Sequence, residues 1–337
     1  MTPCLARRAQ VTPDALGREA VLAAEAVRNT VRFMRTVQHE AIRSSLAKAD
    51  ASPVTVADFV VQALVVSRLA RDFPGDPIVA EEDATPLRSE TADALRRHVV
   101  DLVSHMRPGS DAEQVLGWID RGRGSCGHRF WTLDPIDGTK GLLRGGQYAI
   151  ALALVIDGMV QIGILGCPRL SLRTVQDAEG GLAIAVRDKG AWWAPLSGGV
   201  LTQLAVSAEA CPTRARALRS YESRHGDVAE FNRVLRGLGS AAPPILMDGQ
   251  AKHVLLAAGS AEVLLRIPVD HDYREATWDQ AAGSLLVQEA GGRVTDLEGQ
   301  PLDFTTGRRL LRNRGVLASN GLLHDAVLRV VRQRSAG

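Results

Sequence analysis

One stretch of the sequence constrains the rest more than any other: W-T-L-D-P-I-D-G-T-K-G at residues 131–141. Its first half is an apolar run that ends in two carboxylates, Asp134 and Asp137. Pro135 between them fixes its own φ and has no backbone N–H, so the Ile136 carbonyl is free to point the same way as both acids. Three oxygen ligands from one tight turn suit a hard cation such as Mg²⁺. The run therefore predicts a metal-binding turn at the end of a strand.

The second half of the run is a turn that opens into a short helix. The backbone N–H groups of Gly138 and Thr139 can meet an anion at this helix start. A cation site beside an anion site is the arrangement that metal-assisted phosphate chemistry requires. Taken alone, Asp-Gly after a strand is more often a simple turn, so the remaining motifs have to decide between the two interpretations.

The whole run closely resembles the signature of the lithium-sensitive, Mg²⁺-dependent phosphatase superfamily of inositol monophosphatase. Its continuation, K-G-L-L-R-G-G-Q-Y at residues 140–148, resembles the 3′(2′),5′-bisphosphate nucleotidase branch. The resemblance implies an enzyme that uses two or three Mg²⁺ ions to remove the 3′-phosphate from adenosine 3′,5′-bisphosphate, giving AMP. It also implies activity on 3′-phosphoadenosine 5′-phosphosulfate.

The motif S-P-V-T-V-A-D at residues 52–58 carries the candidate catalytic acid. Thr55 and Asp58 form a capping-box pattern, so Asp58 can simply stabilise a helix terminus. The resemblance instead assigns Asp58 to activation of the attacking water, hydrogen-bonded to the Thr139 hydroxyl. We expect the catalytic role, because the other parts of the site are also present.

Two further acids complete the expected metal site. Glu81 follows a short strand in I-V-A-E-E-D, which resembles the V-G-E-E motif of the superfamily, and Ala80 replaces its glycine. Asp279 lies in T-W-D-Q-A-A-G, where Thr277 is expected to cap a helix. Asp279 is then either an acid that compensates the helix dipole or, by resemblance, a carboxylate that reaches across the domain cleft to metal.

The resemblance divides these ligands between two ions. Glu81, Asp134 and the Ile136 carbonyl are assigned to one ion, and Asp134, Asp137 and Asp279 to the other. Gln280 stands where histidine is common in the superfamily.

The expected substrate-binding side is basic. His225, Lys252 and Arg266 resemble the residues that hold the phosphate that is not cleaved, by charge-assisted hydrogen bonds, although each alone reads as ordinary surface basicity. Gly249 stands where serine is usual, and the missing hydroxyl is expected to cost about 0.5–1.5 kcal/mol in binding. We therefore expect Gly249→Ser to lower KM unless φ at this position is positive. Gly138, Thr139 and Asp279 complete the expected substrate contacts.

The pattern of elements predicts a mixed α+β and α/β protein, a layered αβαβα sandwich. Residues 1–198 are expected to form an α+β metal-binding domain with an antiparallel sheet, and residues 199–337 a mixed α/β domain that contributes Asp279 and the nucleotide-binding side. A long helix is expected to begin at Thr12 and Pro13. Asp157-Gly158 is a hairpin turn signal between two apolar strands.

Charge and composition indicate which classes of binding partner the protein has. The 337 residues carry a formal net charge of +2 and no basic block, so we expect a small-molecule nucleotide partner rather than a nucleic-acid polymer. No apolar run is long enough to span a bilayer, and no membrane partner is expected. Scattered cysteines without a C-x-x-C spacing favour a reducing, cytoplasmic location. We expect a monomer rather than an oligomer.

Two alternatives stay open at this point. The first is a different substrate within the superfamily, such as an inositol phosphate, fructose bisphosphate or histidinol phosphate. The second is a non-catalytic nucleotide or metal sensor, against which the full set of acids at positions 58, 81, 134, 137 and 279 argues.

Overall fold

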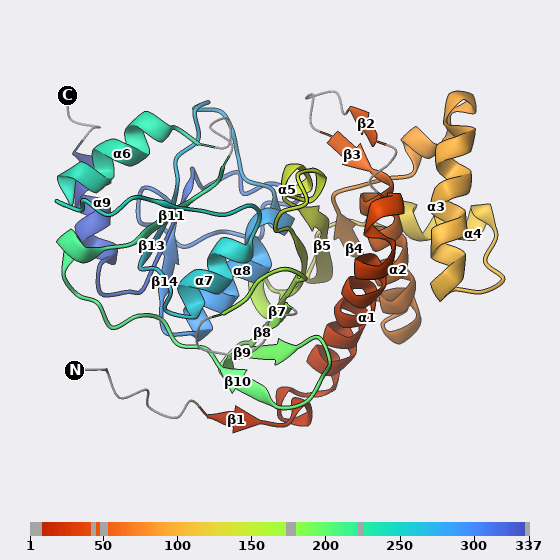
Figure 1. The fold of residues 1–337 in the computed structure, drawn as a ribbon, viewed down its shortest axis with the longest axis horizontal. Helices are drawn as coiled ribbons and strands as arrows, with labels where there is room; N and C mark the ends of the chain where they lie inside the picture. The colour runs from red at the N-terminus through yellow and green to blue at the C-terminus, as the bar shows by residue number, and fades with distance from the viewer. Residues whose placement is uncertain (1–8, 42–44, 48–52, 173–179, 222–225, 334–337) are drawn as a thin grey trace.

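The structure is a computed structural model, and it describes residues 9–41, 45–47, 53–172, 180–221 and 226–333. Within these ranges the chain forms two large sheets separated and covered by helices (Figure 1). A small two-stranded ribbon, β2 (Ser45–Ala47) and β3 (Pro53–Thr55), leads into the second helix.

The first sheet has eight strands in the order β1-β10-β9-β8-β7-β6-β5-β4. Its neighbours pair antiparallel except at the β4 edge, where β4 and β5 run parallel. The strands are β1 (Gln10–Val11), β4 (Ile78–Ala80), β5 (Arg129–Asp137), β6 (Ala149–Ile156), β7 (Met159–Cys167), β8 (Gly181–Val186), β9 (Gly190–Pro195) and β10 (Leu201–Gln203).

The two faces of this sheet differ in side-chain size. Along β6, Ile150, Leu152 and Leu154 point into a core with the N-terminal helices, whereas Ala149, Ala151 and Ala153 point to the opposite face. Small residues let a helix approach that face closely: a Cβ at Gly163 of β7 would lie 2.7 Å from the Ala282 carbonyl. The alternation therefore decides which helix packs on which face.

The outer helices on the first face are α1 (Arg18–Ala41) and α2 (Val56–Asp72), flanked by α3 (Asp93–Met106) and α4 (Ala112–Asp120). The opposite face is covered by α7 (Ala251–Ala257) and α8 (Thr277–Glu289), which lie between the two sheets (Figure 1).

The second sheet has five strands in the order β12-β11-β13-β15-β14 and mixes parallel and antiparallel pairs. Leu264 of β13 packs toward α7 and α8, whereas Leu265 packs toward α6 and α9. The layers are thus α, β, α, β, α, and the expected sandwich is confirmed. The elements are β11 (Ala217–Arg219), β12 (Ile245–Leu246), β13 (Val263–Arg266), β14 (Arg293–Thr295), β15 (Val316–Ser319), α6 (Val228–Gly237) and α9 (His324–Arg332).

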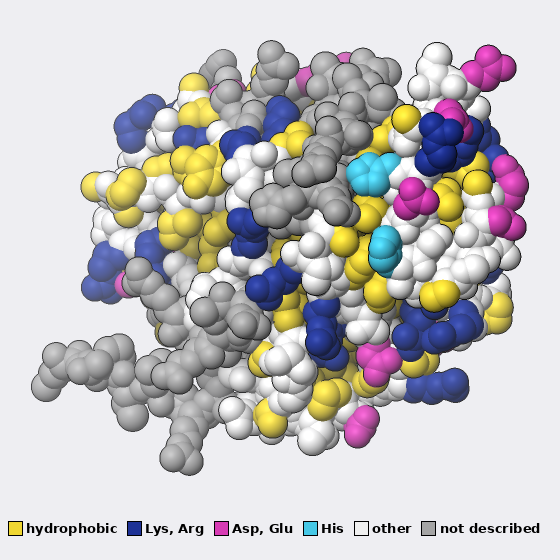
Figure 2. Space-filling model, turned by 45° about the vertical axis from the view of Figure 1, so that its right-hand side comes forward, with side chains coloured by type: hydrophobic (Ala, Val, Ile, Leu, Met, Phe, Trp, Pro, Cys, Tyr) yellow, Lys and Arg dark blue, Asp and Glu magenta, His cyan; other side chains and the backbone are white. Residues whose placement is uncertain are grey.

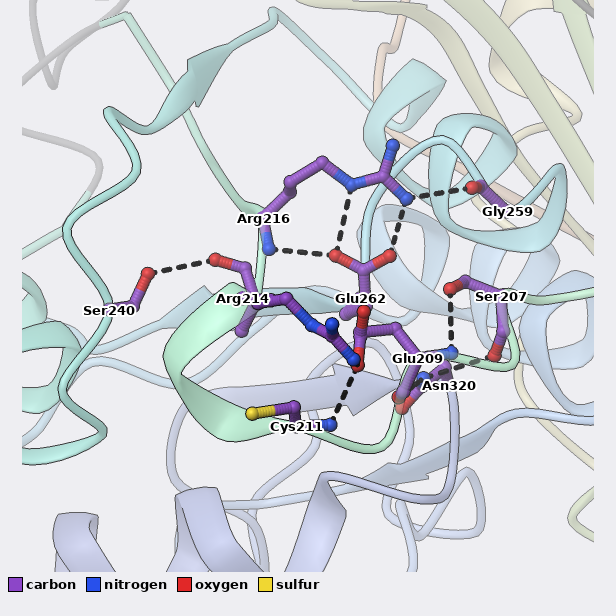
Figure 3. Close-up of polar contacts among 10 residues, drawn as sticks. Ser207, Glu209, Cys211, Arg214, Arg216, Ser240, Gly259, Glu262 and Asn320 are labelled. Carbon is purple, nitrogen blue, oxygen red and sulfur yellow. Dashed lines mark hydrogen bonds and ion pairs between the residues drawn. The ribbon is translucent and has the colours of Figure 1, made fainter. Parts of the chain in front are cut away.

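Hydrogen bonds and ion pairs hold the segment between β10 and β11, which joins the two sheets, against the second sheet (Figure 3). The buried Glu262 carboxylate accepts from the backbone N of Arg216 at 2.7 Å and from its Nε at 3.1 Å. Asn320 donates from Nδ2 to the carbonyls of Ser207 at 3.0 Å and Glu209 at 2.7 Å. The chain leaves the first sheet after Gln203 and enters the second at Ala217. The boundary at residues 198 and 199 lies just before this segment and stays a prediction.

Two local expectations were wrong. The long N-terminal helix does not begin at Pro13: a single 3₁₀ turn spans Pro13–Leu16, and Gly17 then takes a φ of 92°, so the α-helix starts at Arg18. Thr277 does not cap α8. Its hydroxyl donates to the Gly307 carbonyl at 2.7 Å, and Ala276 occupies the N-cap position. In both places a loop contact or a backbone turn overrides the local signal.

Other local expectations were correct. Asp157 and Gly158 both have positive φ, 51° and 72°, as a two-residue hairpin turn requires. In the described part of the chain no helix has the length and apolar content that crossing a membrane requires. On the face that Figure 2 shows, Lys and Arg side chains lie in separate groups rather than in one patch.

Candidate active site

A cavity of about 550 Å³ opens where the two sheets face one another through α7 and α8. Residues that the sequence separates widely line it together. They include residues at the ends of β4, β5 and β13, at the start of α5 (Thr139–Leu143), and on α7 and α8, together with residues of β11, α6 and β15 from the second sheet and its helix. Of the expected site residues, the lining includes Glu81, Asp134, Ile136, Asp137, Gly138, Thr139, Gly249, Lys252, Arg266 and Asp279.

The end of β5 explains how its two aspartates reach the same cavity. Asp134 pairs with Ala151 and Asp137 with Ala149, so the register shifts between them and one strand carries an extra residue there. Pro135 lies in this bulge, where a missing N–H leaves no ladder bond broken. The bulge bends the strand and aims the side chains of both aspartates into the cavity.

We call Glu81, Asp134, Asp137 and Asp279 the carboxylate cluster. Burial, followed by the charges of the other three acids, raises the pKa of Asp134 well above its ordinary value. Burial is also the largest cause at Asp279, where it raises the pKa to about 8, and at Asp137, where it outweighs the nearby Lys252 and Arg266 cations. Burial and like charges therefore oppose ionisation of Asp134, Asp137 and Asp279, and a bound cation would favour their charged forms.

The donor set fits a hard divalent cation. Among the described residues, the Asp134 Oδ1 atom is buried with no hydrogen-bond partner. No three acidic, histidine or cysteine side chains of the described ranges close around one point tightly enough to hold an ion by themselves. Mg²⁺ does not need such a cage, because it retains several waters and takes one or two carboxylates plus substrate phosphate oxygens.

Asp58 makes the contacts that both of its interpretations require. Its Oδ2 accepts from the backbone N and the hydroxyl of Thr55, each at 2.7 Å, which completes the capping box. Its Oδ1 faces the other way and lies 3.5 Å from the Thr139 hydroxyl, which is also 3.1 Å from the Ile136 carbonyl. One carboxylate oxygen is therefore used by the helix cap, and the other faces the turn after β5. Asp58 is buried behind Thr139 and is not among the residues that line the cavity.

The position of Glu81 depends on a side chain that sequence reasoning missed. Gln62, one helical turn after Asp58 on α2, donates from Nε2 to the Glu82 carbonyl at 2.6 Å, and its Oε1 accepts from the Glu82 N–H at 3.1 Å. Gln62 is fully buried. A polar residue inside an apolar helical face was the available signal. Ala80 has no positive φ, so its replacement of glycine causes no backbone strain.

The basic side of the cavity contains Lys252 and Arg266, which we call the cation pair. Lys252 donates from Nζ to the carbonyls of Gly249 at 2.7 Å and Met247 at 3.2 Å, and burial lowers its pKa to about 8. The Arg266 Nε lies 2.8 Å from Glu275 Oε1, and its Nη2 donates to the Tyr273 hydroxyl at 2.9 Å. His225, expected to assist them, lies outside the described residues.

Gly249→Ser was expected to lower KM unless φ at this position is positive, and the structure shows a positive φ. Gly249 has a φ of 63°, and a Cβ there would lie 2.3 Å from the Asp137 carbonyl oxygen. A serine is therefore strained by its backbone and blocked by its neighbour. Gly138 shows the same close approach from the other side, with a φ of 94° and a Cβ position 3.1 Å from the Gly249 nitrogen. The two glycines let the turn after β5 approach the turn before α7 closely.

Comparison with known proteins places this arrangement in context. The model of the inositol monophosphatase family matches residues 14–336. A protein of Emericella nidulans named 3′(2′),5′-bisphosphate nucleotidase is 37% identical, over 94% of this chain and 98% of that one. A protein of the same name from Oryza sativa is 40% identical, over 93% of each chain.

Solved structures agree on the fold. An inositol monophosphatase of Thermotoga maritima superposes with a TM-score of 0.64 at 20% identity, covering 93% of this chain and 96% of that one. A structure titled as an inositol monophosphatase and NADP phosphatase complexed with Mg²⁺ and phosphate gives a TM-score of 0.62 at 17% identity, covering 92% of this chain and 93% of that one.

Proposed function

The chain belongs to the inositol monophosphatase family, and from that premise we propose that it is a Mg²⁺-dependent phosphatase that removes the 3′-phosphate of adenosine 3′,5′-bisphosphate. The products are AMP and inorganic phosphate, and 3′-phosphoadenosine 5′-phosphosulfate is a second substrate. Relatives that carry the nucleotidase name match nearly the whole chain, which supports this substrate class.

One observation carries the proposal: the carboxylate cluster and the cation pair line the same cavity. A phosphate monoester at the carboxylates alone would suit many substrates. A second anion at Lys252 and Arg266 requires a substrate with two phosphate or sulfate groups on one small scaffold. Charge-assisted hydrogen bonds are the strongest contacts available for such a group.

The metal-binding residues follow from the cavity lining. Glu81, Asp134, the Ile136 carbonyl, Asp137 and Asp279 would hold two or three Mg²⁺ ions. Such ions supply a more acidic bound water and neutralise charge on the phosphate oxygens. Asp134 has a buried oxygen without a partner and a pKa raised well above its ordinary value by burial, and both features favour a cation beside it.

The protein's own groups then do the remaining work. Asp58 accepts a proton, through its Oδ1, from the hydroxyl of Thr139 or from the attacking water that this hydroxyl orients. The Gly138 and Thr139 N–H groups bind the phosphate that is cleaved. Arg266 is held in place by Glu275 and Tyr273 before substrate arrives, so less conformational entropy is lost on binding.

A panel of phosphate-release assays tests the proposal. Adenosine 3′,5′-bisphosphate, 3′-AMP and inositol 1-phosphate are compared with and without Mg²⁺. The proposal requires Mg²⁺-dependent release and a clear preference for the bisphosphate. Preference for inositol 1-phosphate would favour an inositol or sugar phosphatase, and no release from any substrate would favour a non-catalytic sensor. The monomeric state and the cytoplasmic location remain predictions.

A further inference from the structure

One arginine, Arg308, contacts residues next to two members of the carboxylate cluster, Glu81 and Asp279. Arg308 lies in the connection between β14 and β15. Its Nη2 donates to the Ala80 carbonyl at 2.7 Å, and its Nη1 lies 3.4 Å from the Gly122 carbonyl. The same guanidinium stacks over the Trp278 ring, with its central carbon 4.7 Å from the ring centroid.

The two contacted residues are each the immediate predecessor of a proposed metal ligand. Ala80 precedes Glu81, which comes from the first sheet, and Trp278 precedes Asp279, which comes from the helix between the sheets. The planar guanidinium of Arg308 thus contacts the backbone immediately before Glu81 and the indole ring immediately before Asp279.

The Glu81 side needs such support. Strand β4 has three residues and pairs with β5 on one side. On its other side the short segment at residues 122–124 forms a single bridge, in which Gly124 N donates to Ile78 O at 2.9 Å and Ala80 N donates to Gly122 O at 2.7 Å. After the strand, Glu81 N donates to Leu133 O of β5 at 3.1 Å. The Ala80 carbonyl points away from β5, and Arg308 supplies its donor.

The Asp279 side is anchored through the backbone of the same loop. The Arg308 carbonyl accepts from Thr277 N at 3.0 Å, and the neighbouring Gly307 carbonyl accepts from the Thr277 hydroxyl at 2.7 Å. Trp278 is almost fully buried, so its ring provides a fixed plane for the guanidinium. Arg308 is therefore tied to the first turn of α8 by main chain and side chain together.

We propose that Arg308 is a positioning residue that sets the spacing between Glu81 and Asp279 and, through it, the affinity of the site for divalent cations. The inference rests on the proposed function, because it takes both acids as metal ligands. Lysine cannot replace it: an ammonium can donate to one carbonyl, but it lacks the planar fork that reaches two carbonyls while stacking on an indole.

The test measures Mn²⁺ binding to the full-length protein by isothermal titration calorimetry, without substrate. Arg308→Met keeps part of the aliphatic packing and removes the guanidinium, and Arg308→Lys keeps the charge. Residues that orient metal ligands typically change affinity by 10–100-fold when they are lost. We expect that loss for Arg308→Met and an intermediate one for Arg308→Lys. At saturating Mg²⁺, KM for the nucleotide should stay within about twofold of the wild type, because the cation pair is untouched.

The matched control is Arg312→Met, on the same loop. Arg312 is largely exposed and pairs with Asp303 at 2.8 Å, away from both ligands, so its loss should leave Mn²⁺ affinity unchanged. Unchanged Mn²⁺ affinity in Arg308→Met, measured well below its melting temperature, would overturn the positioning role while leaving the proposed function standing. A wild-type protein that binds no Mn²⁺ would overturn both.

Discussion

Gly249 lies so close to Asp137 that a Cβ on the glycine would come within 2.3 Å of the Asp137 carbonyl oxygen. This contact joins the turn at the end of β5 to the turn before α7, and α7 carries Lys252 of the cation pair. If the proposed function holds, backbone packing rather than flexible side chains fixes the separation between the cleaved and the retained phosphate.

The first prediction follows from that contact. Gly249→Ser should reduce the free energy of unfolding by about 1–3 kcal/mol, since it adds backbone strain at positive φ and displaces the Asp137 carbonyl. Activity should fall with it. Urea unfolding monitored by fluorescence measures the change. Gly109→Ser is the control, because Gly109 has a φ of 81° and no described atom lies within 4 Å of its Cβ position. Equal destabilisation in the two variants would show that the contact with Asp137 is unimportant.

The second prediction separates the two roles of Asp58. Asp58→Asn should lower kcat by about 10²–10⁴-fold, the usual effect of losing a general acid or base. Stability should hardly change, because the amide oxygen of asparagine can still accept from the backbone N of Thr55 in the capping box. Asp111→Asn is the control for a change in capping alone: Asp111 is the N-cap residue of the capping box at the start of α4 and makes no contact with the turn after β5. A near-normal rate for Asp58→Asn would mean that Asp58 only caps the helix.

The third prediction concerns Asp134. Asp134→Asn should abolish activity and also raise the melting temperature of the metal-free protein, since it removes a buried charge from among like charges. Mg²⁺ should raise the melting temperature of the wild type and not that of the variant. Thermal melts with EDTA and with Mg²⁺ make the comparison. Substantial turnover in the variant would contradict the proposed bridging carboxylate.

The fourth prediction concerns pH and a histidine remote from the cavity. His324 is fully buried, with Nε2 3.0 Å from the Thr295 hydroxyl and Nδ1 2.9 Å from the Ser319 hydroxyl. Burial, with a contribution from Arg293, lowers its pKa to about 4.

The sign of the effect follows from proton binding. Below pH 6.5 the unfolded chain binds a proton at this histidine that the folded protein does not. Stability should therefore fall as the pH drops from about 6.5 to about 4, by up to about 3 kcal/mol. Urea unfolding at several pH values measures the change. Between about pH 6.5 and 4 the free energy of unfolding of His324→Gln should fall less steeply than that of the wild type. An unchanged slope in the variant would contradict the assignment.

The sequence predicted the elements that depend on local pattern. The two apolar strands on either side of Asp157-Gly158, the hairpin turn itself and the capping box of Thr55 and Asp58 were all predicted at the correct places. The acids that line the cavity could be named as well, because they follow strand ends or helix starts in specific motifs.

The failures share a physical cause. Thr277 binds a carbonyl of a distant loop instead of capping its own helix, and Gly249 takes a φ that only its packing partner explains. Gln62 and Arg308 act on the backbones of residues far away in sequence. Apart from the polar Gln62 in an apolar helical face, these contacts leave no periodic or local signal, so a single sequence cannot predict them.

The most direct test of the central claim is the ratio of kcat/KM for adenosine 3′,5′-bisphosphate to kcat/KM for 3′-AMP, measured at saturating Mg²⁺. The second phosphate gains charge-assisted hydrogen bonds from Lys252 and Arg266, worth about 1.5–3 kcal/mol. The account therefore predicts a ratio of about 10–100 in the wild type and a ratio that collapses toward one in Lys252→Met. Equal values for the two substrates in the wild type would contradict the claim that the cavity recognises a second phosphate.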